Sequence, residues 1–587
     1  MNSPDRPEPK DPALPGRKST IQDRERRSVG SRIFRATVVV IVAGILAKLL
    51  GLGKNVIFGA WFGTSDGTTD CFVAAFSIIT AVYFIGEECI GPAFLPVFMD
   101  RRDKDGPGPA WRLASTLFNL QFLLLLAAAA AIFAFAPQIM SFATQWQMED
   151  GLDTLAERQD LFPLAVGFVR WMAPALFGLS LATITFMLLN SRKKFFWASM
   201  GEGSLRAVMA GAVVAFGSQH WLGAWAMPLG VLAGSVAKLA THLPGIRDEF
   251  RAHYRLRLDL SSPDFKRFLL LIAPLVIGSV FAKFRDVYNN VYVMSGAGLA
   301  GGVAAVYFGR SVVEALNSLF PYSLSVGMFP YLCEMAEKGD RKALGEMLDR
   351  SSRFMVFIFL PAAAVLAVTA MPLADFLFVF KKLKPEEAAL IGVVTLYSAM
   401  GMPFYSVERV MMKGYFSNRR TLAPTIIGIC CSALSVAWCY LMIVRLKYHG
   451  RDALVVVSLA AVGARALKVI LLAGNLKRHL PMFKPGDTLV FVLKVLALTA
   501  AVTAAGYGAH EVAARLLPTM AGLAGLKVKL VLMADMAAIG TASLLAFVTA
   551  AWALRMEEWR IVLDWGRGRL ATLLDRLRGK TGQHIGS

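Results

Sequence analysis

The chain has 587 residues, of which 56% are hydrophobic and 18% are charged. Soluble globular chains run nearer ~45–50% apolar and ~25% charged, so the composition excludes a soluble enzyme, a disulfide-rich secreted domain and a disordered chain. The formal net charge is +21, which in a soluble protein would indicate nucleic acid as a partner. The six cysteines lie in or beside apolar runs without paired spacing, so neither a disulfide scaffold nor a zinc ligand set is expected.

Long apolar runs follow one another through most of the sequence. A membrane-spanning helix needs about 20 mostly apolar residues, and runs of that length predict an all-α polytopic membrane protein with about fourteen transmembrane helices. The connections are mostly short, and no soluble domain is inserted. In chain order the predicted spans are 36–62, 71–98, 113–136, 161–189, 198–217, 221–243, 268–293, 302–331, 354–373, 388–412, 422–444, 453–475, 487–509 and 530–554.

The basic residues alternate between the two sides of these spans. Forty Lys and Arg fall on the side of the N-terminal tail, and ten fall on the opposite side. Cytoplasmic loops carry such an excess, so both termini are predicted to be cytoplasmic. The net charge then reflects topology, and no nucleic-acid partner is expected.

Two tails flank the predicted spans. Residues 1–35 are polar and contain five prolines, which predicts a disordered basic cytoplasmic tail rather than a cleaved signal peptide. Residues 555–587 interleave Trp559, Leu563 and Leu570 with arginines. This pattern predicts a basic amphipathic helix lying on the inner membrane face.

An internal repeat organises the spans. Lys48 and Asn55 of span one recur as Lys283 and Asn290 of span seven, 235 residues later, and a Pro and Lys pattern at the end of span two recurs after span eight. Because six spans are an even number, the two copies run parallel about an axis along the membrane normal. The predicted units are an N-lobe at 36–243, a C-lobe at 268–475 and two further helices at 487–554.

Charged residues inside the spans are the main functional signal. Twelve Lys or Arg and seven Asp or Glu lie there, and each base would cost ~2.5–3.5 kcal/mol at a lipid-facing helix centre. Several must therefore face a water-filled cavity or a partner, and the net positive interior favours an anionic cargo. The polarity concentrates at Lys48, Lys54 and Asn55 in span one, at Lys283, Arg285, Asp286 and Asn290 in span seven, and at Arg310, Glu314 and Asn317 in span eight.

Local pairing is the alternative to a cavity. Lys283 with Asp286, and Arg310 with Glu314, could satisfy one another on their own helices. The neighbours Glu408 and Arg409 face apart and need other partners. Arg206, Lys468 and Lys494 are interpreted as structural or as lying at span ends.

Nothing in the sequence forms a catalytic constellation. The histidines are scattered without metal-ligand spacing, and neither a Walker loop nor G-x-S-x-G occurs. The chain is therefore predicted not to be an enzyme and to need no cofactor or metal.

Five short motifs together identify a family. They are AKLLGLGKN at 47–55, TDCFVAAF at 69–76, Glu87 before AFLP at 93–96, YFGR at 307–310 and YFSNRRTLAP at 415–424. With these motifs the chain resembles the MurJ (MviN) family of lipid-linked cell-wall precursor flippases, within the multidrug/oligosaccharidyl-lipid/polysaccharide exporter superfamily. The resemblance covers residues 36–554.

The resemblance implies two six-helix lobes around a central cationic cavity, with the last two helices forming a groove for a polyprenyl tail. By position, Lys48, Lys54 and Arg310 would hold the diphosphate, and Asp70 and Glu87 would be gate or sugar contacts. The polar stripes add the remaining predicted site residues, Asn55, Lys283 and Arg285.

The resemblance also implies partners and a location. The cargo would be an undecaprenyl-diphosphate-linked glycan in the bacterial inner membrane. The protein would be surrounded by lipids and monomeric, with possible contacts to cell-wall or polysaccharide synthesis enzymes.

The chain departs from the family pattern at several positions. The family usually has arginines at Lys48 and Lys54 and an acid at Asn55, and its paired span-two arginines fall here at Val82 and Tyr83. Lysine attracts phosphate but lacks the bidentate fork of arginine.

A divergent lipid II flippase that works by alternating access is therefore the expected function. Flipping of an exopolysaccharide or O-antigen precursor stays open as an alternative. So do a small-molecule or cation antiporter and a non-transporting scaffold.

Overall fold

The computed structural model describes residues 42–146, 161–192, 194–219, 221–317, 328–329, 331–418, 420, 422–517, 525–560 and 563. Over these residues the chain is helical and contains no strand, only an isolated bridge between Phe380 and Leu383. The tail predicted at 1–35 lies outside the described residues, as does most of the tail predicted at 555–587. The predicted all-α membrane fold is confirmed.

Ten described helices are long and apolar enough to cross a membrane, and two bent pairs raise the number to twelve. The ten are built on the first helix (Val42–Phe62), α2 (Thr68–Asp105), α3 (Pro107–Ala134), α8 (Ala226–His253), α9 (Pro263–Val287), α13 (Arg341–Phe378), α16 (Leu422–Cys439), α17 (Arg451–Lys477), α18 (Pro485–Leu516) and α19 (Leu526–Ala553). Short pieces between them are α4 (Ala136–Ala143), η2 (Gly223–Trp225) and α10 (Val293–Ser295).

The bent pairs occupy the fourth and tenth predicted spans. Helices α5 (Leu161–Met172) and α6 (Ala175–Ser191) meet at 43°, and α14 (Pro385–Ala399) and α15 (Met402–Ser417) meet at 46°. Pro174 caps α6 and Pro403 lies in the first turn of α15, and a proline cannot continue the preceding helix without loss of a hydrogen bond. Helices α7 (Phe195–Phe216) and α11 (Gly302–Asn317) lie in the two remaining predicted spans, and the count of fourteen stays a prediction.

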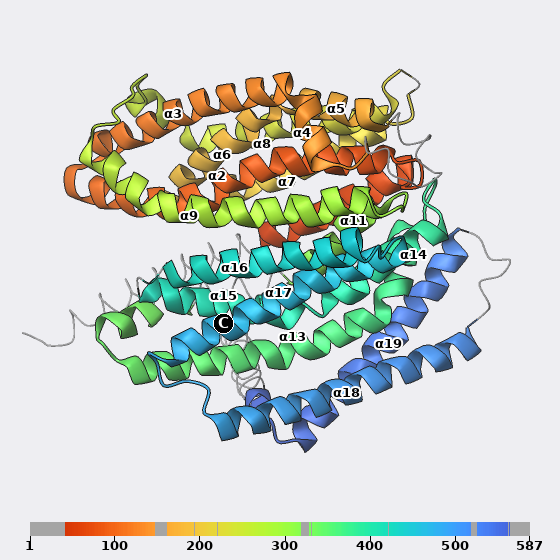
Figure 1. The fold of residues 1–587 in the computed structure, drawn as a ribbon. Coiled ribbons are helices and arrows are strands. Elements are labelled where there is room, and N and C mark those ends of the chain that lie inside the picture. The colour runs from red at the N-terminus through yellow and green to blue at the C-terminus, as the bar shows by residue number, and fades with distance from the viewer. Residues whose placement is uncertain are drawn as a thin grey trace, which may run out of the picture.

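The helices form two bundles and a pair. In Figure 1, α2–α8 gather in one half and α13–α17 in the other, with α9 and α11 where the halves meet. Helix α9 packs against both α2 and α16, and α13 packs against α18 and α19. We call the first helix with α2–α8 the N-lobe and α9–α17 the C-lobe, so the lobe boundary runs between α2 and α9 and between the first helix and α11.

Two helices are longer than their apolar runs predict. Helices α2 and α13 have 38 residues each, which corresponds to about 57 Å, against a hydrocarbon core of about 30 Å. Both continue through internal prolines, which transmembrane helices tolerate because neighbouring groups satisfy the freed carbonyls. One end of the molecule collects the basic segments 101–112, 247–267 and 338–353, together with Arg192 and Lys194. We call it the basic end.

At the opposite end, aromatic side chains close the lobe boundary. Phe58 and Phe72 of the N-lobe contact one another at 5.2 Å between ring centroids, and Phe308 and Phe378 of the C-lobe stack at 5.6 Å. All four belong to one buried apolar cluster that spans both lobes. A Cβ on Gly59 would meet Leu383 at 2.7 Å, so the first helix approaches the C-lobe closely here. The lobes are thus sealed at this end.

Candidate functional site

Two carboxylates join the lobes at the sealed end by accepting hydrogen bonds from backbone N–H groups. Asp70, in the first turn of α2, accepts hydrogen bonds from the backbone N–H groups of Gly301 (3.0 Å) and Ala304 (2.7 Å) at the start of α11. Glu387 of α14 accepts from the backbone N–H of Ser65 (2.8 Å) in the other lobe. Each lobe therefore holds a loop of the other. Asp70 is buried in this contact, and its role as a gate stays a prediction.

Lys54 and Asn55 link the first helix to α11. The Lys54 Nζ donates to the Tyr307 hydroxyl at 3.3 Å and lies 4.8 Å from the ring centroid of Phe58. The Asn55 amide donates to the Ser311 hydroxyl at 2.7 Å. Both side chains are buried, so in this conformation they contribute to the lobe contact.

Lys48 lies further toward the basic end of the first helix and is half-buried. Among the described residues it makes no hydrogen bond or ion pair, although it interacts electrostatically with Glu202. The guanidinium of Arg206, from α7, donates to the Ala47 carbonyl at 2.5 Å and pairs with Glu202 at 3.4 Å. Arg206, interpreted above as structural, therefore lies beside the predicted phosphate ligands.

A third N-lobe base comes from α8. Lys238 is buried, pairs with Glu202 and donates to the Tyr83 hydroxyl at 2.5 Å. Tyr83 is one of the two positions at which the resemblance predicts arginine, and here Lys238 brings a cation next to it from another helix. Glu87 interacts electrostatically with Lys238 and Glu202. Sequence spacing gave no signal for this cluster, because its members are on three helices.

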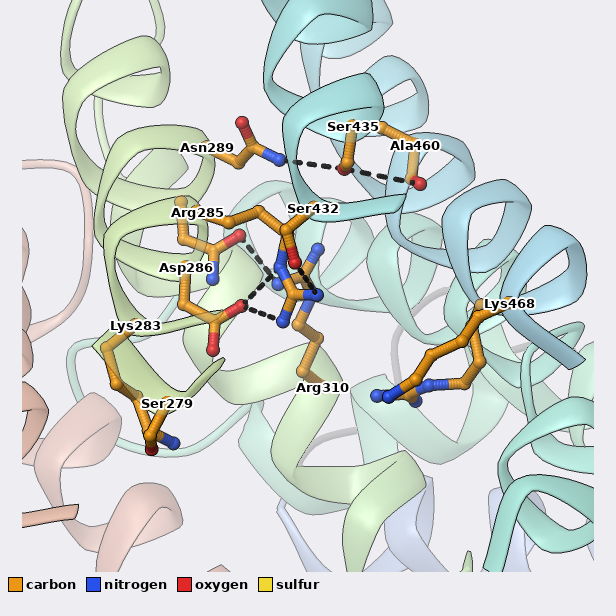
Figure 2. Close-up of polar contacts among 12 residues, drawn as sticks. Ser279, Lys283, Arg285, Asp286, Asn289, Arg310, Ser432, Ser435, Ala460 and Lys468 are labelled. Carbon is orange, nitrogen blue, oxygen red and sulfur yellow. Dashed lines mark hydrogen bonds and ion pairs between the residues drawn. The ribbon is translucent and has the colours of Figure 1, made fainter. Parts of the chain in front are cut away.

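Lys283 crosses the lobe boundary instead of pairing on its own helix. Its Nζ is 2.8 Å from a carboxylate oxygen of Glu88, which also accepts from Ser279 at 2.8 Å. The alternative pairing of Lys283 with Asp286 is wrong. Figure 2 shows Ser279 and Lys283 together on one side of α9, away from Arg285.

Two guanidinium groups of the C-lobe converge around Asp286 (Figure 2). Arg285 pairs with Asp286 at 2.7 Å and donates to the Ser432 hydroxyl at 3.3 Å. Arg310 donates to the Asn290 side-chain oxygen at 2.6 Å and to a backbone carbonyl of α17 at 3.2 Å, so the suggested pairing with Glu314 is also wrong. The Asp286 side chain is 41% exposed, which places this cluster against accessible space rather than packed protein.

Further along the C-lobe, Glu408 pairs with Lys468 at 2.6 Å and with Arg465 at 3.4 Å. Lys468, predicted to be structural or at a span end, thus has an acidic partner. Figure 2 shows Lys468 apart from the Arg285 and Arg310 group. Arg409, the sequence neighbour of Glu408, donates to the Tyr405 hydroxyl instead.

The helices that carry these clusters are locally irregular. A π-helical segment, Tyr288–Tyr292, follows α9, and another, Tyr440–Arg445, follows α16. Within the first, the Asn289 amide donates to the Ser435 hydroxyl at 3.0 Å. Such segments are rare and occur frequently at functional sites, and here they adjoin the Arg285 cluster.

The charges of the two lobes add to a positive site. Bases outnumber acids by nine to six, with Lys48, Lys54, Arg206, Lys238, Lys283, Arg285, Arg310, Arg465 and Lys468 against Glu87, Glu88, Glu202, Asp286, Glu314 and Glu408. Several are partly exposed although they lie within membrane-spanning helices. Residual positive charge in a low-dielectric setting favours a polyanionic ligand. No group of three metal-ligating side chains occurs in the described part of the chain.

A separate open groove lies between the last two helices. Its volume is about 410 Å³, and it is lined mainly by small apolar residues, Ala505, Gly508, Ala509, Val512, Ala513, Leu516, Leu517, Ala534, Ala538 and Ala542. Near it, His510 Nδ1 lies 3.0 Å from the carboxylate oxygens of the buried Asp535. Its apolar lining could contact a hydrocarbon chain, and the lipid-tail groove predicted at 487–554 stays a prediction.

Comparison with known proteins establishes the family to which the chain belongs. The model of the family described as "Lipid II flippase MurJ" matches residues 58–525. The chain belongs to this family. That membership also makes it a member of a transporter family rather than of an enzyme family.

Curated relatives agree over most of the chain. A probable lipid II flippase MurJ of Rhizobium tropici is 24% identical over 67% of this chain and 72% of its own length. One of Bdellovibrio bacteriovorus is 23% identical over 77% and 83%. The lipid II flippase MurJ of Burkholderia cenocepacia is 22% identical over 78% and 87%.

Solved structures show the same fold. A lipid II flippase MurJ in an inward closed conformation superposes with a TM-score of 0.68 at 18% identity, covering 88% of this chain and 99% of that one. An inward-facing multidrug resistance MATE family transporter of the MOP superfamily gives 0.52 at 13% identity, over 76% and 95%. The chain therefore has the fold shared by MurJ and MOP-superfamily transporters.

Proposed function

We propose that this protein translocates lipid II, an undecaprenyl-diphosphate-linked peptidoglycan precursor, across the bacterial inner membrane by alternating access. Family membership and the names of the relatives support lipid II as the cargo. The observation that carries the proposal is the positive site made by both lobes. A diphosphate needs concentrated positive charge with hydrogen-bond donors, and guanidinium groups provide both.

The diphosphate would bind between Lys48 and Arg206 of the N-lobe and Arg285 and Arg310 of the C-lobe. Lys48 has no competing described partner, and each guanidinium has N–H groups beyond those already bonded. Lys238 and Lys283 would neutralise Glu202 and Glu88, two carboxylates that would otherwise repel the incoming phosphates. Binding by both lobes couples the cargo to their relative movement.

The conformation supports entry of the headgroup from the basic end. The opposite end is fastened by Asp70 and Glu387, whereas Leu49 of the first helix and Leu316 of α11 are 59% and 51% exposed nearer the basic end. We propose that the headgroup passes between these two helices while the polyprenyl tail stays in the bilayer, against the groove of α18 and α19.

The charge distribution supports a cytoplasmic basic end. Excess Lys and Arg mark cytoplasmic loops, so the headgroup would enter from the cytoplasmic leaflet and both termini would be cytoplasmic. We propose that the protein acts as a monomer, because one chain provides both lobes of the site.

Complementation tests the proposal. A bacterium conditionally depleted of its own lipid II flippase would receive the wild-type chain, the R310A variant or the R310K variant. Rescue is expected from the wild type and not from R310A, and R310K should rescue partially because it keeps the charge and loses the bidentate geometry. Immunoblots of membrane fractions would establish equal protein levels.

Translocation by purified protein separates the remaining alternatives. Proteoliposomes would be loaded with labelled lipid II or with an undecaprenyl-diphosphate-linked polysaccharide precursor, and external enzymes would report the flipped fraction. Preference for the polysaccharide precursor, transport of a cationic dye, or full activity of R310A would each contradict the proposal.

A further inference from the structure

A second polar cavity lies at the basic end of the C-lobe, away from the lobe boundary. Its volume is about 140 Å³, and its lining is Arg341, Asn418, Arg420, Leu476, His479 and Leu480. These residues come from the start of α13, the end of α15 with the residues that follow it, and the end of α17 with the residues that follow it. Three separate elements therefore contribute two arginines and a histidine, all three exposed, to the lining of one small surface pocket.

The bases of this cavity are not neutralised within the described part of the chain. Arg341, Arg420 and His479 make no ion pair there, and the nearby Asp340 carboxylate is engaged with the backbone N–H of Ala343 at 3.0 Å. Some other exposed bases at the same end have acidic partners, such as Arg101 with Asp264 at 3.2 Å and Lys104 with Asp100 at 2.9 Å, whereas Arg478, beside the cavity, has none among the described residues. The cavity is thus a local excess of positive charge.

The N-lobe offers a comparison within the same molecule. Arg192 follows α6 as Arg420 follows α15, and it pairs with Glu249 of α8 at 2.8 Å. Lys194 nearby donates to the Gly245 carbonyl at 2.8 Å. At the corresponding end of the N-lobe, Arg192 thus has an acidic partner although its Nη1 has no hydrogen-bond partner, whereas the bases of the C-lobe cavity have no acidic partner among the described residues.

Size and chemistry limit what could bind. The cavity is less than half the ~300 Å³ at which pockets begin to hold drug-sized ligands, so it suits one small group. Two arginines with an additional nitrogen donor are typical of phosphate recognition, and basic pockets between transmembrane helices bind lipid headgroups. Leu476 and Leu480 contribute the apolar part of the lining.

We propose that this cavity is a binding site for a single phosphate group, separate from the cargo site. The phosphate can be inorganic, or it can belong to the headgroup of an anionic membrane lipid. The site is independent of the flipping activity proposed above, because none of its residues lies at the lobe boundary. Its occupancy would tie together the ends of α13, α15 and α17.

Binding to the full-length purified protein tests the site. The R420Q/H479Q variant removes two of the three bases, R341Q removes the third, and R478Q is the matched control because Arg478 is an exposed neighbour that does not line the cavity. In one arm, thermal denaturation is followed during a titration with inorganic phosphate at constant ionic strength. In the other, native mass spectrometry counts phosphatidylglycerol retained from mixed micelles.

The wild type and R478Q should bind about tenfold more tightly than R420Q/H479Q or R341Q in at least one arm, since a charge-assisted hydrogen bond to phosphate is worth about one decade of affinity. A difference in the phosphate arm assigns a free anion, and a difference confined to the lipid arm assigns a headgroup. Equal behaviour of wild type and R420Q/H479Q in both arms would overturn the proposal. An equal loss in R478Q would also overturn it, because it would show general surface charge.

Discussion

Glu88 of α2 and Lys283 of α9 form an ion pair across the lobe boundary, with 2.8 Å between the carboxylate oxygen and Nζ. The Phe84 ring lies 4.7 Å from the same Nζ. The pair is formed in the conformation whose opposite end is sealed, and it joins the two lobes about midway along the described helices. Any relative rotation of the lobes changes the distance between these two groups.

Reversing the Glu88–Lys283 pair should preserve function better than breaking it. E88K places two cations together and should abolish complementation, whereas E88K/K283E restores opposite charges and should recover part of it. Because Glu88 is half exposed, the coupling free energy in a double-mutant cycle of thermal stability should be only about 0.5–1 kcal/mol. Failure of the swap together with normal function of E88Q would contradict a role for the pair.

Gly51 and Gly53 provide a matched test of Arg206. A Cβ on Gly51 would lie 2.9 Å from the Arg206 guanidinium, whereas nothing lies within 4 Å of a Cβ on Gly53. Both substitutions replace a helical glycine by alanine, which by itself stabilises by about 0.5–1 kcal/mol. G51A should therefore reduce flipping by displacing Arg206 while G53A leaves it unchanged, as measured in proteoliposomes. Equal activity of the two variants would show that the position of Arg206 does not matter.

Asp70 should control opening of the sealed end. D70N removes the charge that stabilises the N-terminus of α11, at a cost of about 1 kcal/mol. The neighbouring Cys71 is fully buried, so its maleimide labelling reports opening in a variant whose other cysteines are replaced by serine.

Labelling of Cys71 should be several-fold faster in D70N than in the parent. D66N is the control, because Asp66 is exposed and accepts only from the nearby Thr68 N–H among the described contacts. Unchanged labelling in D70N would show that the carboxylate does not hold the lobes together.

Loss of His510 should lower thermal stability mainly because the Asp535 carboxylate loses its hydrogen-bond partner. H510A leaves the buried carboxylate of Asp535 without its described partner, which costs about 1–3 kcal/mol. H510A/D535N removes that charge and should recover part of the loss. The readout is thermal denaturation in detergent, and H449A, in an exposed loop, is the neutral control. A double variant less stable than H510A would contradict this account of the α18–α19 contact.

Hydropathy located the spans because burial in lipid depends on long apolar runs, but it could not find where the helices end. Span two was predicted at 71–98 and α2 extends to Asp105, and span nine was predicted at 354–373 and α13 begins at Arg341. Polar helical turns outside the bilayer have no hydropathy signal. The breaks at Pro174 and Pro403 were likewise not predicted, since transmembrane helices tolerate proline without bending.

The candidate site residues were predictable where one helix carries several polar residues or, as for Asp70 and Glu87, where a motif carries the family resemblance. The stripes of spans one and seven led to Lys48 and Lys283, and Arg310 came from span eight. Arg206 and Lys238 were missed as site residues because each is a single base on its own helix. The acidic partner of Lys283 could not be predicted from the sequence either. Glu88 is 195 positions away, and only the packing of α2 against α9 brings the two residues together.

Because α2 is long, ion pairs lie at both the outer and the inner part of its contact with α9, and the two parts respond differently to salt. Asp100 pairs with Arg267 at 2.8 Å and Arg101 with Asp264 at 3.2 Å, about 18 Å along the helix from Glu88. These two outer pairs are exposed to water, where raising ionic strength from 0.15 M to 1 M shortens the Debye length from about 8 to 3 Å. Because Lys283 is 17% exposed whereas Arg267 and Arg101 are 58% and 44% exposed, the outer part of the contact should loosen more with salt than the inner pair, so that ionic strength changes how tightly α2 and α9 are joined at the basic end.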